Sequence, residues 1–215
     1  MRYTSVLFDL DGTLLDTLGD LTAAMNRTLT RHGLPERTRQ QMRAALGNGA
    51  RRLMELSVPA GTDSALFETL LAEYNADYAA HCRIETAPYP GVAALLLKLH
   101  AQGRKLAIVS NKPDEAVRAL RADFFANAVP IAVGETAAIR RKPAPDMLLA
   151  AMEQLGADPA GTVFVGDSEV DIATARAAGL PCISVLWGFR DRDVLERAGA
   201  QQFAADAGEL ARLLD

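Results

Sequence analysis

Two aspartates close an apolar run near the start of the chain. Asp9 and Asp11 stand in VLFDLDGTLLDT (6–17), and Gly12 and Thr13 follow at once. Side chains two residues apart on an extended chain point to the same side. Two carboxylates held so close repel each other unless a cation or a hydrogen-bond donor neutralises them. The pair therefore indicates a site that handles a cation, and Gly12 would let the backbone approach a ligand closely.

Polar residues also follow other apolar, strand-like runs. Ser110 and Asn111 come after KLAIV (105–109), and Asp167 comes after TVFV (162–165). Lys142 ends the short basic run RRK, just before a helical stretch. In open α/β sheets, ligands bind beyond the carboxyl ends of the strands. We therefore expect these side chains to converge with the two aspartates at one edge of a sheet.

Each of these segments also has an ordinary structural interpretation. Ser110 and Asn111 ahead of Pro113 suit the start of a helix. The spacing Ser168-x-x-Asp171 fits a capping box, and Lys142 could be a surface lysine. Together, however, they predict more than capping. Three carboxylates suit Mg²⁺, which binds protein carboxylates along with water and phosphate oxygens. Lys142 and the N–H groups after Ser110 would attract a phosphate.

The elements that must position these residues alternate between two types. Short β-branched runs alternate with helical stretches in most of the chain, which predicts a doubly wound, Rossmann-like α/β core with a parallel sheet. Residues 16–83 lack strand-like runs and instead show helical stripes of apolar residues, such as Leu21, Met25 and Leu29. The expected organisation is an α/β core (1–15 and 84–215) interrupted by a small cap of about four helices (16–83).

Composition narrows the possible partners. The 215-residue chain has a formal net charge of −4, which argues against binding to nucleic acid. No apolar run is long enough for a membrane span, and the first residues do not resemble a signal peptide. Cys82 and Cys182 lack metal-binding spacing, so we expect free thiols in a reducing compartment. These features predict a cytoplasmic protein with a small-molecule partner and without a membrane partner.

The polar segments resemble a known family. FDLDGTLLDT (8–17), SN (110–111), RKPAP (141–145) and GDSEVD (166–171) are similar, in order and context, to the four motifs of the haloacid dehalogenase-like (HAD) superfamily of phosphatases. In addition, ALGNGARRL (45–53) and the segment 179–200 resemble the cap and C-terminal segments of phosphoglycolate phosphatases. The resemblance implies a Mg²⁺-dependent phosphatase that acts on a small phosphorylated metabolite, with 2-phosphoglycolate as the first candidate.

The resemblance also implies roles for individual residues. Asp9 would be the nucleophile that forms an aspartyl-phosphate, and Asp11 would be the general acid and base. Ser110 would bind the transferring phosphoryl group, and Lys142 would neutralise its charge. Glu169 would lie near the metal. The expected metal-binding residues are Asp9, Asp11 through its main-chain carbonyl, Asp167 and, in support, Asp171.

Further residues are expected to contact the substrate. Gly12, Thr13 and Asn111 would do so from the core. In the cap, two glycines surround Asn48 and a helix is expected to begin at about Ala50. By itself this is an ordinary helix–helix turn, but free N–H groups and a nearby arginine could also bind an anion. The expected cap contacts are Gly47, Asn48, Gly49 and Arg51.

Four other activities can be compared with that of a phosphatase. The dehalogenases of the superfamily lack a second acid at the position of Asp11. The presence of Asp11 in this chain therefore favours phosphoryl transfer over dehalogenation. Pyrophosphatases and phosphosugar mutases share the aspartate pair and stay open as alternatives. A serine hydrolase would need a glycine where Val170 stands. A non-catalytic binding module would tolerate loss of Asp9 or Lys142, and both are present.

Overall fold

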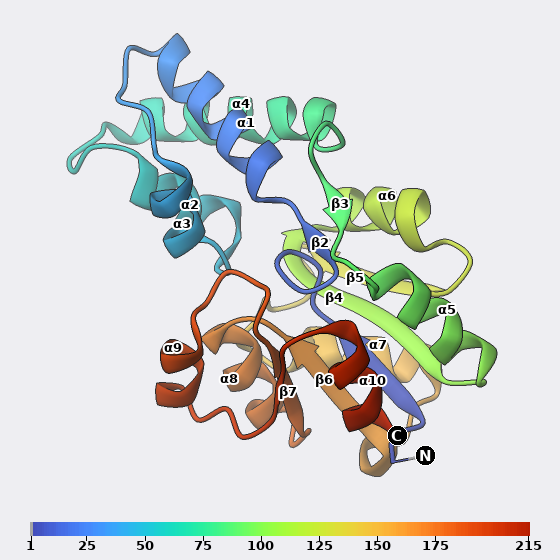
Figure 1. Cartoon of the computed structure of the whole chain (residues 1–215). Helices are drawn as coiled ribbons and strands as arrows, with labels where there is room; N and C mark the ends of the chain where they lie inside the picture. The colour runs from blue at the N-terminus through green and yellow to red at the C-terminus, as the bar shows by residue number, and fades with distance from the viewer. Residues whose placement is uncertain (1) are drawn as a thin grey trace. The chain divides into compact units, whose positions relative to one another are not determined.

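The structure, a computed structural model, describes residues 2–215 and contains two compact units (Figure 1). The α/β unit consists of the residues up to Leu15 together with Pro88–Asp215, and the helical unit is Asp16–Ala87. The chain leaves the α/β unit through β2 (Leu15–Asp16) and returns through β3 (Ala87–Pro88), and these two strands form a small sheet of their own. The helical unit is therefore an insertion after the first strand.

The α/β unit is built on a parallel sheet. Within residues 2–215 it has six strands in the order β5-β4-β1-β6-β7-β8, and every recorded pairing is parallel. The strands are β1 (Ser5–Phe8), β4 (Lys105–Pro113), β5 (Ile131–Glu135), β6 (Thr162–Gly166), β7 (Cys182–Val185) and β8 (Phe203–Ala204). The predicted α/β fold class is confirmed.

Helices cover both faces of this sheet. Leu7 of β1 lies in a buried cluster with Met147 and Leu148 of the helix that follows β5. Val6 and Phe8 alternate with Leu7 along the strand, and they are also 0% exposed. This double coverage explains the continuous apolar runs of the central strands. The helices are α5 (Val92–Ala101), α6 (Asp114–Phe125), α7 (Asp146–Leu155), α8 (Glu169–Ala177), α9 (Arg192–Arg197) and α10 (Ala207–Leu214).

The strand order places a topological switch point at β1. From β4 the chain moves outward to β5, and it then crosses to the other side of β1 to form β6. The carboxyl ends of β4, β1 and β6 are therefore neighbours at the position where open α/β sheets bind ligands. Asp9 directly follows β1, Ser110 lies in the last part of β4, and Asp167 directly follows β6.

The helical unit contains four helices, as the sequence predicts. They are α1 (Leu18–Arg31), α2 (Arg39–Ala45), α3 (Gly49–Ser57) and α4 (Ser64–His81). The predicted stripe of α1 is buried, with Leu21 at 5% exposure and Met25 and Leu29 at 0%. Asp77 of α4 binds Arg27 and Arg31 of α1 at 2.6 and 2.8 Å, which ties the two longest helices of the unit together. Among the described residues, none of the helices combines the length and hydropathy that a membrane span requires.

The structure decides between the two interpretations of two polar segments. Ser110 and Asn111 are not a helix cap, because β4 continues to Pro113 and α6 begins only at Asp114. The pairing of Pro113 with Glu135 of β5 extends the strand past the polar residues. The capping box of Ser168 and Asp171 is present at the start of α8. Asp171 therefore has a structural role in addition to any chemical one.

Gly12 allows the turn after β1 to lie against Asp167. Its φ is +84°, and a Cβ atom there would lie 2.3 Å from Oδ2 of Asp167. We predict that Gly12→Ala lowers the free energy of unfolding by at least about 2 kcal/mol, because it adds a steric clash to backbone strain. Gly179→Ala is the matched control, since φ is +70° there and nothing lies within 4 Å. It should cost only about 1 kcal/mol. Urea denaturation measures both, and equal losses would show that the turn does not depend on this close approach.

Candidate active site

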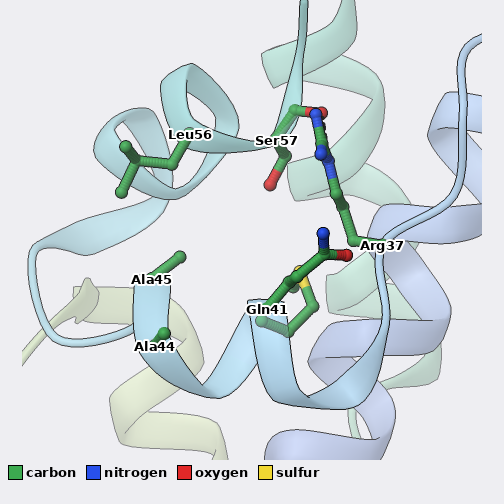
Figure 2. Close-up of a pocket in the computed structure, with 7 residues that line it drawn as sticks. Arg37, Gln41, Ala44, Ala45, Leu56 and Ser57 are labelled. Carbon is green, nitrogen blue, oxygen red and sulfur yellow. Dashed lines mark hydrogen bonds between the residues drawn. The ribbon is translucent and has the colours of Figure 1, made fainter.

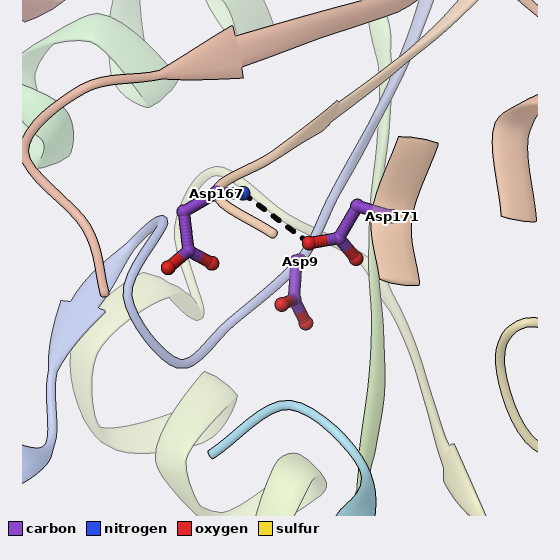
Figure 3. Close-up of side chains that lie close together, drawn as sticks. All are labelled: Asp9, Asp167 and Asp171. Atoms are coloured by element: carbon purple, nitrogen blue, oxygen red, sulfur yellow. Dashed lines mark hydrogen bonds between the residues drawn. The ribbon is translucent and has the colours of Figure 1, made fainter. Parts of the chain in front are cut away.

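Three buried carboxylates meet at the carboxyl ends of β1 and β6. Asp9, Asp167 and Asp171 each offer an oxygen atom, and these atoms lie within 4.8 Å of one another (Figure 3). The residues are 7%, 1% and 0% exposed. Carboxylates removed from water at such short range need opposite charge or hydrogen bonds to stay ionised. The rest of the site supplies part of that compensation.

Lys142 is the cation at the centre of the site. Its Nζ atom lies 2.8 Å from Oδ1 of Asp9 and 2.7 Å from Oδ1 of Asp171, and its side chain is 2% exposed. Burial by itself would lower the pKa of Lys142, but the charges of Asp171 and Asp9 outweigh it and raise that pKa above its ordinary value. Lys142 therefore stays a full positive charge. The structure brings it to the two acids from the loop ahead of α7, as the sequence predicts.

Asn111 holds the backbone of that lysine. Its Nδ2 donates to the carbonyl of Lys142 at 3.0 Å, and its Oδ1 accepts from the N–H of Lys142 at 2.8 Å. This reciprocal pair fastens the loop before α7 to the end of β4. The side-chain amide thus has a positioning role. Its expected contact with a substrate stays a prediction.

Asp171 uses both of its oxygens within the chain. Oδ1 accepts from Lys142, while Oδ2 accepts from the N–H groups of Asp167 and Ser168 at 3.2 and 3.1 Å. The hydroxyl of Ser168 also donates to Oδ2, at 2.7 Å. Asp171 therefore orients the lysine and closes the turn between β6 and α8. These contacts favour the supporting role that the sequence analysis gives it.

Asp167 is held on its other side by the loop after β7. Its Oδ2 accepts from the N–H of Phe189 at 2.6 Å, and its Oδ1 accepts from the hydroxyl of Thr13 at 3.3 Å. Burial, reinforced by Asp171, raises the pKa of Asp167 to about 7, although the Phe189 N–H acts in the opposite direction. Burial also raises the pKa of Asp9 well above its ordinary value, with Asp171 adding to the effect and Lys142 opposing it.

The donor set fits a hard divalent cation. One lysine does not balance three carboxylates, and burial together with the charge of Asp171 raises the pKa values of Asp9 and Asp167. Oxygen ligands without histidine or cysteine are typical of Mg²⁺ or Ca²⁺ rather than of Zn²⁺. A divalent cation between Asp9 and Asp167 would supply the missing positive charge. The cluster is therefore a candidate metal site.

Asp11 is more exposed than the three clustered acids. Its side chain is 19% exposed, and its Oδ1 atom lies 3.2 Å from Nζ of Lys112, whose side chain is 4% exposed. Ser110, the next predicted residue, is 2% exposed, and its hydroxyl accepts from the N–H of Lys112 at 3.3 Å. Lys112 is absent from the residues predicted from the sequence. Its position directly after Ser110 and Asn111 was the signal that could have found it.

A second residue missed from the sequence is Arg190, which pairs with the first residue of α8. Arg190 binds Glu169 at 2.7 Å, and its side chain is 9% exposed. Glu169 begins α8, beside Asp167 and Asp171, and its carboxylate faces this arginine. Arg190 also opposes the rise in the pKa of Asp167. A lone arginine far along the chain carries no local pattern that would single it out.

The predicted cap residues lie in the helical unit, around the start of α3. Asn48 precedes this helix without a side-chain capping bond, and α3 begins at Gly49. Arg51 forms two hydrogen bonds with Glu68, at 2.8 and 2.9 Å. The hydrogen bond with Glu68 raises the pKa of Arg51, so the arginine is charged and paired. The expected contacts of Gly47, Asn48, Gly49 and Arg51 with a substrate stay predictions.

The helical unit also contains a pocket of about 370 Å³ between α2 and α3 (Figure 2). Its one cationic wall residue, Arg37, donates from Nε to the carbonyl of Ser57 at 2.8 Å. The described lining has neither an acid nor a histidine nor a cysteine, so it offers no group for proton transfer or metal binding. The lining residues are Arg37, Gln41, Met42, Ala44, Ala45, Leu56 and Ser57.

The raised pKa of Asp167 predicts a pH-dependent response to a cation. Between its ordinary value of 3.8 and about 7, the folded protein holds a proton that the unfolded chain has released. Without a cation, stability therefore falls as pH rises through this window. A cation needs the ionised carboxylate, so Mg²⁺ should raise the melting temperature more at about pH 8 than at about pH 5.

The measurement is thermal unfolding with Mg²⁺ or with a chelator at both pH values. Asp167→Asn removes the titrating ligand and should abolish most of the Mg²⁺ effect at the higher pH. A Mg²⁺-induced shift of the same size at both pH values in the unaltered protein would contradict the assignment of Asp167 to the metal site.

Comparisons with known proteins agree with this geometry. The sequence pattern of the haloacid dehalogenase-like hydrolases matches residues 6–185. The chain is 36% identical over 192 residues to a phosphoglycolate phosphatase of Xanthomonas campestris pv. campestris, covering 88% of this chain and 86% of the relative. It is 34% identical over 217 residues to the N-acetylmuramic acid 6-phosphate phosphatase of Pseudomonas aeruginosa, covering 100% and 96%.

A solved structure extends the likeness to both units. The crystal structure of a protein from Lactobacillus delbrueckii subsp. bulgaricus, provisionally named a phosphoglycolate phosphatase, matches with a TM-score of 0.94 at 35% identity. It covers 100% of this chain and 99% of that one. The match includes the parallel sheet and the helical insertion after the first strand. The chain therefore belongs to the haloacid dehalogenase-like hydrolases, and it is a phosphatase of that family.

Proposed function

We propose that this phosphatase hydrolyses 2-phosphoglycolate in a Mg²⁺-dependent reaction that proceeds through a phosphoryl group on Asp9. The observation that carries the chemistry is the buried carboxylate of Asp9 between Lys142 and the metal-site acid Asp167. The choice of substrate is supported by the phosphoglycolate phosphatase relatives, which share about a third of the sequence over most of the chain.

Asp9 has one oxygen that the chain holds and one that it leaves for chemistry. Lys142 Nζ lies 2.8 Å from Oδ1, and the N–H of Leu10 donates to the same atom at 2.7 Å. Both of these contacts involve Oδ1 and not Oδ2. We assign Oδ2 as the atom that attacks phosphorus. The bond from Oδ2 to phosphorus forms as the bond from phosphorus to the ester oxygen breaks.

Asp11 handles the protons of both steps. It gives a proton to the leaving ester oxygen, and it then takes one from the water that attacks the phosphoryl group on Asp9. Phosphate leaves, and the carboxylate of Asp9 is restored. With an exposed fraction of 19%, the side chain of Asp11 is more open than those of Asp9 and Lys142. That exposure suits a group that must meet the leaving alcohol and then water.

The remaining residues bind the phosphoryl group. The ammonium of Lys142 and the hydroxyl of Ser110 would face its oxygens, since Lys142 contacts Asp9 and Ser110 lies in the last part of β4, next to β1. Mg²⁺, held by Asp9, Asp167 and the main-chain carbonyl of Asp11, would neutralise the negative charge that gathers there. Asp171 would keep Lys142 in place through its contact at 2.7 Å.

A second substrate has specific support. The N-acetylmuramic acid 6-phosphate phosphatase relative matches this chain over its whole length, at 34% identity. Its substrate is a sugar phosphate, and its leaving group is far larger than glycolate. The acids and lysine of the α/β unit suit both esters, because the phosphoryl chemistry is the same. The two candidates differ only in the recognition of the leaving group.

A panel of phosphate compounds tests the substrate. We expect kcat/KM to be highest for 2-phosphoglycolate among that ester, N-acetylmuramic acid 6-phosphate, p-nitrophenyl phosphate and pyrophosphate. Excess chelator should abolish turnover of all of them, and Mg²⁺ should restore it. Measuring released phosphate against isomerised sugar phosphate separates a phosphatase from a mutase. A higher kcat/KM for N-acetylmuramic acid 6-phosphate would replace phosphoglycolate as the proposed substrate.

Two substitutions separate the roles of the opening acids. Asp9→Asn should abolish turnover and any labelled phosphoenzyme, since it removes the nucleophile. Asp11→Asn should slow turnover by roughly 10²–10⁴-fold, because it removes a positioned acid and base. Rapid-quench labelling with a radioactive phosphate ester measures the phosphoenzyme. Near-normal turnover by Asp9→Asn would exclude the aspartyl-phosphate route.

A further inference from the structure

Lys112 is a buried cation beside the group that meets the leaving alcohol. Its Nζ atom lies 3.2 Å from Oδ1 of Asp11, and its side chain is 4% exposed. It occupies the end of β4, two residues after Ser110, so the same strand supplies the predicted phosphoryl-binding hydroxyl and this ammonium. The chemistry proposed above does not use it.

The contact between Lys112 and Asp11 limits the distance between the Lys112 ammonium and the ester oxygen of a bound substrate. To protonate the leaving oxygen, a carboxylate oxygen of Asp11 must come within hydrogen-bond distance of it. Lys112 lies 3.2 Å from Oδ1 of Asp11. Its ammonium then lies within about 6 Å of the ester oxygen if Oδ1 transfers the proton, and within about 8 Å if Oδ2 does. Lys142, in contrast, sits between Asp9 and Asp171, on the phosphoryl side of the ester bond. Lys142 therefore faces the phosphoryl group, and Lys112 faces the leaving group on the other side of the ester bond.

The candidate leaving groups differ in the charge that they carry near the ester oxygen. In 2-phosphoglycolate a single carbon joins the ester oxygen to a carboxylate. In a sugar 6-phosphate the atoms at that distance are neutral carbons and hydroxyl or ring oxygens. In N-acetylmuramic acid 6-phosphate the one carboxylate belongs to the lactyl group on O3, many bonds away from the ester oxygen. An ammonium at the position of Lys112 can therefore pair directly with the carboxylate of phosphoglycolate, whereas the sugar offers only neutral groups next to its ester oxygen.

We propose that Lys112 is the residue of the α/β unit that recognises the carboxylate of the leaving group, and so selects phosphate esters with an anionic group one carbon from the ester oxygen. This inference rests on the proposed function, because it assumes a small carboxylate-bearing substrate. Charge recognition at this position needs no contribution from the helical unit. Arg51, the cation expected there from the sequence, is already paired twice with Glu68.

The test compares three esters that separate charge from leaving-group chemistry. 2-Phosphoglycolate carries the carboxylate, and 2-phosphoglycolamide replaces it by a neutral amide of similar size on an alkyl alcohol. p-Nitrophenyl phosphate is neutral at that end and has a leaving group that needs little protonation. The readout is the ratio of kcat/KM for phosphoglycolate to kcat/KM for the amide, which cancels any general loss of activity.

We expect the unaltered enzyme to favour phosphoglycolate over the amide by at least about tenfold. Lys112→Met keeps much of the side-chain length without the charge, and it should lower this ratio by roughly 10–100-fold, mainly through KM for phosphoglycolate. Lys112→Arg retains a cation and should keep most of the ratio. Lys98→Met, on the exposed face of α5, is the matched control and should leave the ratio unchanged.

Several results would overturn the proposal. Equal losses on phosphoglycolate and the amide, with p-nitrophenyl phosphate affected less, would show that Lys112 acts only through proton transfer by Asp11. Equal losses on all three esters, or no loss, would give it a structural role or none. The same ratio in Lys112→Met and Lys112→Arg would exclude charge recognition.

Two controls keep the test decisive. Thermal unfolding shows whether Lys112→Met folds. If it does not, Lys112→Gln takes its place, and the ratio measured for the unaltered enzyme tests the inference without any variant. If the unaltered enzyme has the same kcat/KM for phosphoglycolate as for the amide, the inference is overturned. Failure of the proposed function appears differently, as a higher kcat/KM of the unaltered enzyme for N-acetylmuramic acid 6-phosphate than for phosphoglycolate.

Discussion

The structure of the site depends on one buried ammonium between two buried carboxylates. Lys142 lies within 2.8 Å of Asp9 and of Asp171, and the three side chains come from segments far apart in the chain. Removing one member of such a buried ionic group leaves an uncompensated charge, at a cost of about 3–5 kcal/mol. The loops after β1, before α7 and after β6 must therefore keep these positions together. Asn111 and the capping box of α8 fix two of those loops.

Charge compensation also organises the surroundings of this group. Asp11 pairs with Lys112, and Glu169 pairs with Arg190, so each of these two acids faces a cation. Asp167 differs, because it faces backbone N–H and hydroxyl groups and its pKa rises to about 7. The place that lacks positive charge is thus the place where a divalent cation would bind. The contacts of Asp9 with Lys142 and with the N–H of Leu10 both involve Oδ1.

The relatives show that this chemistry is shared by enzymes with different substrates. A phosphoglycolate phosphatase and an N-acetylmuramic acid 6-phosphate phosphatase match the chain at similar identity. Phosphoryl transfer needs the same nucleophile, cations and proton donor for both esters, so those residues do not reveal the substrate. Selection must come from groups on the leaving-group side of the ester bond. We propose Lys112 as such a group in the α/β unit.

The sequence by itself determined the α/β class and the helical insertion, and it predicted that Asp9, Asp11, Lys142 and Asp167 would converge at one edge of the sheet. Those features are local: apolar runs, a helical period, and acids or a lysine next to strand ends. Local pattern left a helix cap open as one interpretation of Ser110 and Asn111, and the structure excludes it because the pairing of Pro113 with β5 extends β4 past them. Only the tertiary structure decided that Lys112 meets Asp11 and that Arg190 meets Glu169. Pairing between residues distant in sequence depends on how strands and loops are placed side by side, and no local periodicity encodes that placement.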